Sequence, residues 1–169
     1  MTIFLKVIGG ALIILSGYGV GDYLKKTLDK RLCQLSDIIT ITNFIHDEIE
    51  YLACDFQTIR DRLISEIALS SLDFLKIYSE ENSLSPPSQW KMAVELSNLD
   101  ATDRVKHEFL SIGDIIGSYP KEVQLNKLRL IINFLEGESL ELKEYINSHG
   151  AMYKKLSVLL SVAILIILI

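Results

Sequence analysis

The chain contains few of the residues from which enzymes and metal proteins usually build their sites. Its 169 residues include two cysteines and three histidines, with no C-x-x-C pair, which is too little for a structural zinc site. The chain also lacks a Walker loop, a G-x-S-x-G turn, an H-E-x-x-H motif and a dinucleotide-binding glycine set. We therefore expect no enzyme activity, no metal, no cofactor and no small-molecule substrate.

The chain also lacks a continuous surface of positive charge. Between residues 22 and 155 there are 16 Lys and Arg against 22 Asp and Glu. No helix face forms a basic stripe, so the sequence does not predict nucleic-acid binding, and we expect protein partners instead. We interpret Cys33 and Cys54 as reduced packing residues in a cytosolic environment.

What the chain does have is an apolar run at each end, separated by a polar region. Residues 3–24 would span about 33 Å as a helix, enough for a hydrocarbon core of about 30 Å. The second run reaches about 28 Å if its helix begins at Ala151 with nearby lysines extending outward. We therefore predict transmembrane helices at 3–24 and 154–169, in contact with the lipid bilayer, around one domain at 25–153. A cleaved signal peptide is the alternative for the first run.

Positive charges near the apolar runs predict the orientation of the chain in the membrane. They lie on the side of the middle domain, which places that domain in the cytoplasm by the positive-inside rule. In the first run, Gly17 and Gly21 form a small-xxx-small pair that permits close helix approach. The charges in question are Lys25, Lys26, Lys30, Arg31, Lys143, Lys154 and Lys155.

Between the apolar runs the sequence predicts helices and no strand, so the expected fold is an all-α bundle of about six helices between two terminal transmembrane helices. The first helix is expected to continue out of the membrane as far as Leu52, with Leu35, Ile39 and Ile49 on the same stripe as Leu52. Asp55 is the expected N-cap of a second helix, and prolines delimit later ones. The remaining helices are expected at 56–69, from 71, at 88–96, at 102–116 and from 120. The last carries a heptad-like seam of Leu125, Leu128, Ile132, Leu135, Leu142 and Ile146.

The segment that contains His46 beside acidic residues is the only one that suggests a chemical reaction. His46 and Asp47 follow a membrane anchor, as in the phosphoacceptor box of sensor histidine kinases, which leaves a membrane-bound signalling protein as an alternative function. A structural histidine bordering the apolar stripe is the other interpretation. The acidic patch of Asp47, Glu48, Glu50 and Asp55 is suited to a metal or a basic partner, or is simply the solvated face of a helix.

The order of features resembles the stage III sporulation protein AB family. The resemblance covers nearly the whole chain and includes a glycine-containing first anchor and a C-terminal anchor. The residues that carry it are Leu35, Glu48, Ile49, Tyr51, Trp90, Phe109, Gly113, Ile116, Gly117, Gln124, Leu135 and Glu136.

This resemblance implies a role rather than a reaction. The family looks like the cytoplasmic domain of the platform protein in type II secretion and type IV pilus systems. It implies membership of the channel complex between mother cell and forespore, in the outer forespore membrane, with the domain facing the mother-cell cytoplasm. Expected partners are a secretion-type ATPase and other membrane subunits of the channel; a helical scaffold of another pilus or secretion apparatus is the alternative. Docking candidates are Glu48, Glu50, Tyr51, Gly113 and Gly117, although tight packing and helix termination also explain the two glycines.

Overall fold

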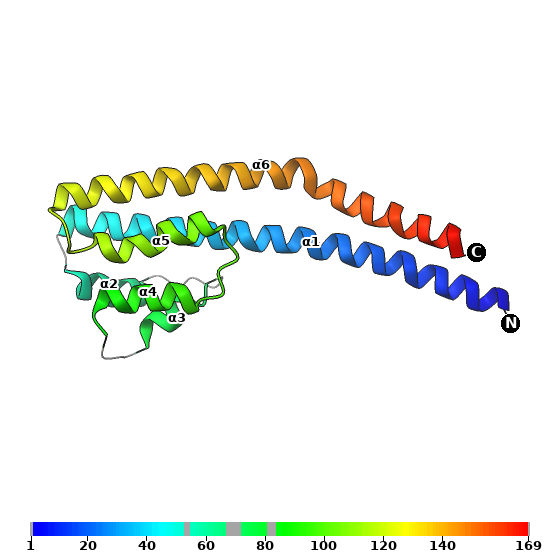
Figure 1. Ribbon diagram of the computed structural model, residues 1–169, viewed down its shortest axis with the longest axis horizontal. Coiled ribbons are helices and arrows are strands. Elements are labelled where there is room, and N and C mark those ends of the chain that lie inside the picture. The colour runs from blue at the N-terminus through cyan, green and yellow to red at the C-terminus, as the bar shows by residue number, and fades with distance from the viewer. Residues whose placement is uncertain (1, 53–54, 67–71, 81–83, 169) are drawn as a thin grey trace. The chain divides into compact units, whose positions relative to one another are not determined.

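The computed structural model describes residues 2–52, 55–66, 72–80 and 84–168, apart from the side chains of residues 2–8, 10–14, 66, 151, 153–154 and 167–168. The described part is helical and contains no strand (Figure 1). Its elements are α1 (Thr2–Asp47), the π-helical turn η1 (Glu48–Leu52), α2 (Phe56–Glu66), α3 (Phe74–Ser79), α4 (Pro86–Leu96), α5 (Asp103–Ile115) and α6 (Lys121–Leu168). The all-α prediction is therefore confirmed.

The chain divides into two compact units. One comprises residues 31–140, and the other comprises residues 1–30 together with residues 141–169. The first unit contains η1 and the helices α2 to α5 with the adjoining parts of α1 and α6. The second unit is a pair of helices formed by the beginning of α1 and the end of α6.

Several helix boundaries differ from the sequence prediction. The first helix ends at Asp47, and the remaining turn to Leu52 is π-helical. α4 begins at Pro86 rather than at residue 88, because proline is tolerated in the first turn of a helix. α2 ends at Glu66 and α3 begins at Phe74. Residues 67–71, over which the second helix was expected to end and the third to begin, lie outside the described residues.

Four aromatic side chains form the centre of the larger unit. Phe74 and Tyr78 come from α3, Trp90 from α4 and Phe109 from α5, and each is at most 1 % exposed. The Trp90 ring lies 4.8 Å from Phe74, 5.5 Å from Tyr78 and 5.0 Å from Phe109, all edge-to-face. Its indole N–H donates a hydrogen bond to the Phe109 carbonyl at 2.9 Å. Burial raises the pKa of the Tyr78 hydroxyl. This aromatic cluster joins α3, α4 and α5 into one packed layer.

The buried stripe of α1 matches the sequence prediction in part. Leu35 and Ile49 are buried as expected, whereas Ile39 is only half-buried and Leu52 is 54 % exposed. Ile38, Ile41 and Ile45, which are fully buried, complete the stripe. The wider π-helical turn rotates Leu52 away from the core, because each turn contains more residues than an α-helical turn. Cys33 is exposed, so its interpretation as a packing residue was wrong; Cys54 lies outside the described residues. On α6 the predicted seam is largely buried, with Leu128 and Leu135 inaccessible to solvent.

The smaller unit contains a close contact between α1 and α6, which run side by side in Figure 1. Gly17 and Gly21 are both buried. A Cβ atom at Gly17 would lie 2.8 Å from the Ser161 Cβ and 2.9 Å from the Ser157 carbonyl oxygen. Elsewhere in the same helix pair, the aliphatic part of the Lys25 side chain packs beside Gly150. Small residues on both helices therefore allow the backbones to approach each other.

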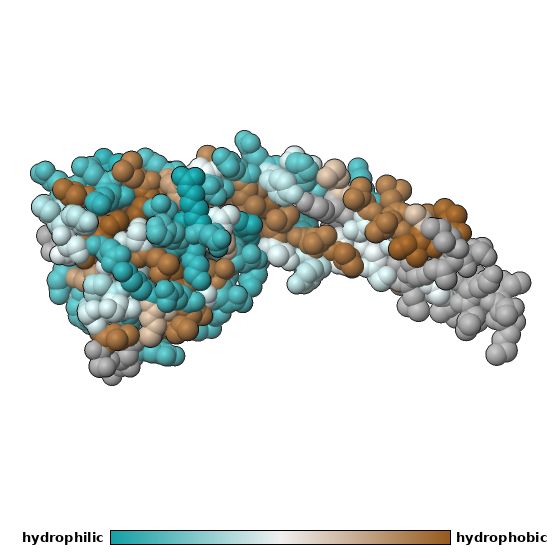
Figure 2. Space-filling model, in the orientation of Figure 1, coloured by the Kyte–Doolittle hydropathy of each residue, from teal (hydrophilic) through white to brown (hydrophobic). Residues whose placement is uncertain are grey.

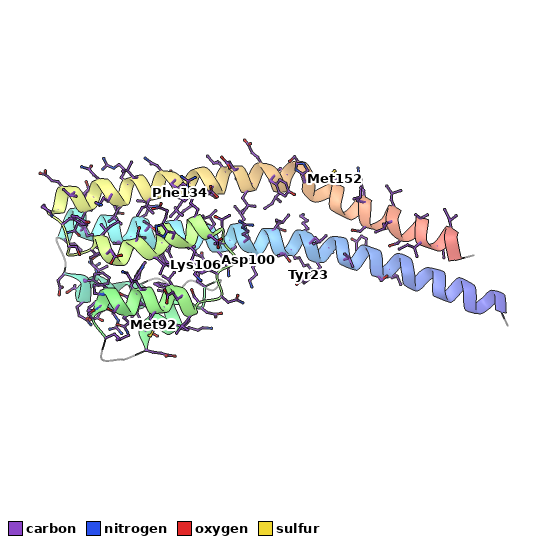
Figure 3. All side chains as sticks on the ribbon, in the orientation of Figure 1. Tyr23, Met92, Asp100, Lys106, Phe134 and Met152 are labelled. Carbon is purple, nitrogen blue, oxygen red and sulfur yellow. The ribbon has the colours of Figure 1, made fainter. Side chains whose placement is uncertain are left out.

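The apolar character of this unit bears on membrane association. Among the described residues, one segment, Lys121–Ile166 of α6, is long and apolar enough to cross a membrane. Figure 2 shows apolar side chains gathered on the described surface of the helix pair, and Figure 3 labels Tyr23 on α1 and Met152 on α6. Half of the side chains of the predicted first span, 3–24, lie outside the described residues, so that span stays a prediction.

A matched pair of glycine substitutions tests the packing of α5 on α4. A Cβ at Gly113 would lie 2.9 Å from Trp90 Cδ1 and 3.3 Å from the Pro87 carbonyl oxygen, whereas nothing lies within 4 Å at Gly137. We expect Gly113→Ala to lower the free energy of unfolding by about 1–2 kcal/mol through overpacking, and Gly137→Ala to raise it by about 1 kcal/mol through helix propensity. Urea unfolding of the full chain in mild detergent, followed by circular dichroism, measures both. Stabilisation by Gly113→Ala would contradict the packing described.

Cysteine cross-linking tests the contact between α1 and α6. In a chain with Cys33→Ser and Cys54→Ser, we expect Gly17→Cys with Ser161→Cys to form an intramolecular disulfide. The Cβ atoms start closer than the roughly 3.8 Å of a relaxed bridge, so the helices need to separate by only about 1 Å. Gly19→Cys with Ser161→Cys is the control, because nothing lies within 4 Å of a Cβ at Gly19. Equal cross-linking of both pairs, read by mobility in non-reducing gels, would disprove the contact.

Candidate functional site

The docking residues predicted from the sequence lie at two helix ends within the larger unit: in η1, which follows α1, and at or just after the last turn of α5. Between these two ends is a cavity of about 200 Å³, which we call the loop cavity. η1, the beginning of α2, the loop between α5 and α6, and the beginning of α6 all contribute to it. Its lining residues are Ile49, Asp55, Phe56, Ile116, Gly117, Lys121 and Gln124.

Gly117 forms the turn that follows α5, and it is part of the wall of the loop cavity. Its φ angle is 76°, in the left-handed region where glycine is favoured. The Gly117 N–H donates to the side-chain oxygen of Gln124 at 3.2 Å, and the Gln124 amide donates to the Tyr119 carbonyl at 2.5 Å. Gln124 thus fixes the conformation of the loop. Gly113, by contrast, is buried against Trp90 and does not reach the surface.

A lysine connects the beginning of α6 to η1. The Lys121 ammonium donates to the backbone carbonyl of Glu50 at 2.6 Å. This carbonyl lies in the last turn of the helical segment, where α-helical partners are missing. Next to it, the side chains of Tyr51 and Leu52 are 76 % and 54 % exposed. Two large apolar side chains are therefore held in solvent beside the loop cavity.

Glu48 does not belong to a solvated acidic face. The residue is 5 % exposed, and its carboxylate accepts a hydrogen bond from Arg62 Nη1 at 2.6 Å. Burial of the carboxylate requires this partner, because an unpaired buried charge is costly. The prediction that Glu48 lies on an exposed docking face is therefore wrong. Asp47 and Asp55 are exposed, and Glu50 is partly exposed.

Asp55 caps α2, as the sequence predicted. Its carboxylate accepts a hydrogen bond from the Thr58 backbone N–H at 3.3 Å. Hydrogen bonds from the Thr58 side chain and backbone stabilise the ionised form and lower the pKa of the Asp55 carboxyl. The beginning of α2 is thereby fixed at the edge of the loop cavity.

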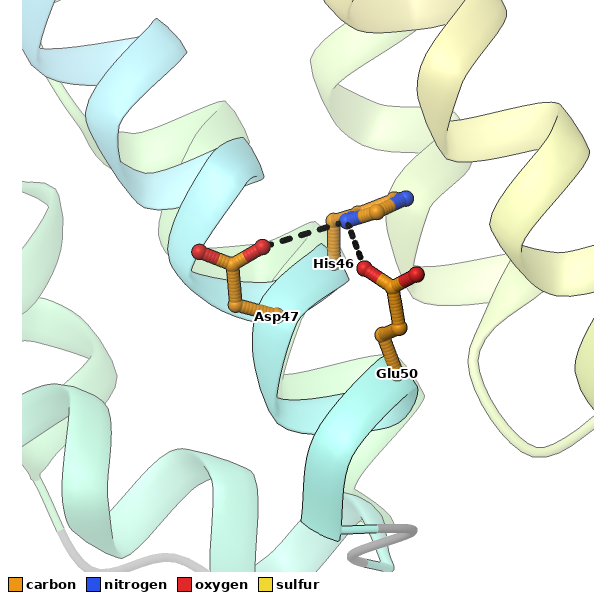
Figure 4. A group of neighbouring side chains, drawn as sticks. All are labelled: His46, Asp47 and Glu50. Carbon is orange, nitrogen blue, oxygen red and sulfur yellow. Dashed lines mark hydrogen bonds and ion pairs between the residues drawn. The ribbon is translucent and has the colours of Figure 1, made fainter.

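His46, Asp47 and Glu50 form a cluster at the end of α1 (Figure 4). The His46 Nδ1 atom lies 3.3 Å from an Asp47 oxygen and 3.7 Å from a Glu50 oxygen. The residue is 8 % exposed, and its Nε2 atom is buried with no hydrogen-bond partner. A metal on Nδ1 would leave a proton on Nε2 with no acceptor, contrary to the usual support of ligating histidines. Donation from Nδ1–H to the neighbouring carboxylates accounts for these contacts without a metal, and we interpret the cluster as structural.

Three residues of this region were not predicted from the sequence to have these roles. Arg62, Lys121 and Gln124 each bond to a residue in another element or across a loop. Pattern analysis detects periodic apolar faces and helix caps, which are local. The bond from the Gly117 N–H to Gln124 crosses the loop between α5 and α6, so helical periodicity gives no sign of it.

Removal of Arg62 tests whether Glu48 is a structural residue. We expect Arg62→Met to lower the free energy of unfolding by about 2 kcal/mol, less than for a fully buried pair because the Arg62 side chain is 34 % exposed. Lys76→Met is the control, since Lys76 and Asp73 form an exposed pair at 3.7 Å whose loss costs about 0.5 kcal/mol or less. Urea titrations of both variants provide the comparison. Equal effects would mean that Glu48 does not depend on Arg62.

Comparison with known proteins gives one result. No curated protein and no solved structure matches the chain. A family model for stage III sporulation protein AB matches residues 6–169, which include both apolar ends and every residue of the loop cavity. The resemblance seen in the sequence is confirmed, and the chain belongs to the stage III sporulation protein AB family.

Proposed function

We propose that the chain is a non-enzymatic platform that docks a secretion-type ATPase within the channel complex between mother cell and forespore. Membership of the family gives the chain a role in stage III of sporulation; the platform and the ATPase are the proposal. The observation that carries it is the surface beside the loop cavity. There Tyr51 and Leu52 are exposed on a backbone fixed by Lys121 and next to a loop fixed by Gln124.

A fixed apolar surface of this kind favours protein docking. Exposed aromatic side chains on ordered backbone contribute strongly to protein interfaces, because little conformational entropy is lost when they are buried. Charged residues surround the surface, including Asp47, Asp55 and the partly exposed Glu50. A basic patch on the ATPase would complement these carboxylates.

The membrane part of the proposal has two spans. The proposed span 154–169 overlaps, over residues 154–166, the α6 segment that is long and apolar enough to cross a bilayer. Residues 3–24 form the second proposed span. The close approach of α1 and α6 at Gly17 favours their insertion as a pair. In this arrangement the larger unit faces the mother-cell cytoplasm from the outer forespore membrane, alongside other membrane subunits of the channel.

The signalling alternative receives no support from the site. A phosphoacceptor histidine must present a ring nitrogen to a kinase, and His46 is 8 % exposed with its Nε2 atom buried. Its other nitrogen faces Asp47 and Glu50, which would repel an incoming phosphoryl group.

Direct binding tests the proposed function. The full chain in lipid nanodiscs is titrated with the secretion-type ATPase of the same sporulation system, and calorimetry is expected to give a dissociation constant of micromolar or tighter, about 8 kcal/mol. Tyr51→Ala is expected to weaken binding about tenfold, because an exposed anchor is removed. The matched control is Leu96→Ala, which removes another side chain that is 66 % exposed, on α4.

The outcomes are distinct. Loss of binding in Tyr51→Ala but not in Leu96→Ala supports docking at the loop cavity. Equal binding by both variants would move the docking surface elsewhere on the domain. No binding by a chain whose circular dichroism shows native helix content would reject the ATPase platform and favour a passive scaffold.

A further inference from the structure

A second hollow lies between α5 and α6 within the larger unit, away from the loop cavity lining. It has a volume of about 420 Å³, and we call it the α5–α6 groove. Its floor contains the buried Ile115 and Ile131, and its edge carries Leu130, which is 70 % exposed. Figure 3 shows Phe134 on the side of α6 that faces α5. The lining residues are Arg104, Glu108, Ser111, Asp114, Ile115, Tyr119, Lys127, Leu130, Ile131 and Phe134.

Two cations of the groove rest on aromatic rings. The Arg104 guanidinium lies 4.4 Å from the centre of the Phe134 ring, and the Lys127 ammonium lies 4.5 Å from the centre of the Tyr119 ring. Neither has a carboxylate partner among the residues that the structure describes. Stacking on rings holds both cations in place and leaves their charges available to a ligand.

The carboxylates of the groove do not neutralise these cations. Asp114 pairs with Lys91 outside the groove at 2.6 Å. Glu108 remains, so two cations face one available acid. This local excess of positive charge contrasts with the unit as a whole, which has 10 Lys and Arg against 18 Asp and Glu between residues 31 and 140.

The shape of the groove fits a helix. α5 and α6 are consecutive helices joined by a short loop and lie antiparallel, and the wall from Arg104 to Ile115 is about 17 Å long at roughly 1.5 Å per residue. An amphipathic helix of about three turns lies in such a groove with its apolar positions on the floor. The two cations then lie near opposite ends of the groove, where acidic side chains of the ligand can reach them.

We propose that the α5–α6 groove binds an acidic amphipathic helix of a partner protein, with Leu130 and Phe134 contacting its apolar face and Arg104 and Lys127 binding its carboxylates. The assignment rests on the proposed function for the identity of the partner, the secretion-type ATPase. The groove itself depends only on the contacts described above. Binding here and contact at Tyr51 would give the partner two points of attachment.

The first arm of the test uses defined peptides. The full chain in nanodiscs is titrated with a synthetic helix that has leucines at i, i+3, i+4 and i+7 and flanking glutamates, and with the same helix carrying lysines instead. Arg104→Gln with Lys127→Gln removes both groove cations. Lys106→Gln with Arg129→Gln is the matched control, because it removes two charges from the same helices at positions that do not line the groove.

The proposal predicts that only the glutamate peptide binds. The groove variant should bind it at least tenfold more weakly, and the control variant within about twofold of the unchanged chain, at low salt. Equal binding of the two peptides, or equal losses in the groove and control variants, would overturn the proposal. Fluorescence of the single buried Trp90 reports whether each variant keeps its fold.

The second arm uses the ATPase and separates the two proposals. Competition between the glutamate peptide and the ATPase, with tenfold weaker ATPase binding by the groove variant, supports both. ATPase binding that neither the peptide nor the groove variant alters would overturn the groove as the partner's site and leave the proposed function intact. Binding of the glutamate peptide without any ATPase binding would overturn the proposed function and support the groove.

Discussion

Burial of the Trp90 ring is the interaction on which the larger unit depends. The ring contacts aromatic side chains of α3 and α5, and its N–H bonds to the backbone of α5 at Phe109. The close fit at Gly113 then fixes the position of α5 against α4. Because α5 ends two residues later, at Ile115, and the Gly117 turn follows, the same packing determines where the loop to α6 begins. The surface features discussed above are therefore consequences of a core contact.

The helices could be predicted because their causes are local. Apolar periodicity located α5 and the buried seam of α6, and the predicted cap at Asp55 acts within one turn. In the structure Thr102 caps α5 in the same way and accepts a hydrogen bond from the Val105 N–H. The π-helical turn was missed, because nothing in its composition distinguishes it from a continuing α-helix. Its extra residue per turn changed which side chains of the segment are buried.

The candidate site was predicted less well, because its contacts join distant parts of the chain. The order of residues gives no indication that Glu48 would be buried beside Arg62, or that Arg104 would lie on the Phe134 ring. The resemblance identified the correct family, but the docking candidates taken from it include both buried structural residues and exposed ones. Gly113 and Glu48 stabilise the fold, whereas Tyr51 is exposed.

The hydrogen bond that the Lys121 ammonium donates to η1 determines which amino-acid replacements the site tolerates. Its acceptor is the backbone carbonyl of residue 50, not the glutamate side chain. Any amino acid at position 50 presents the same carbonyl, so this link between η1 and α6 survives every replacement there that keeps the turn. For this bond, the constraint falls on position 121 alone. In a family of related chains, a replacement at position 50 would leave this bond in place without a compensating change, while the long cationic side chain opposite it would have to persist.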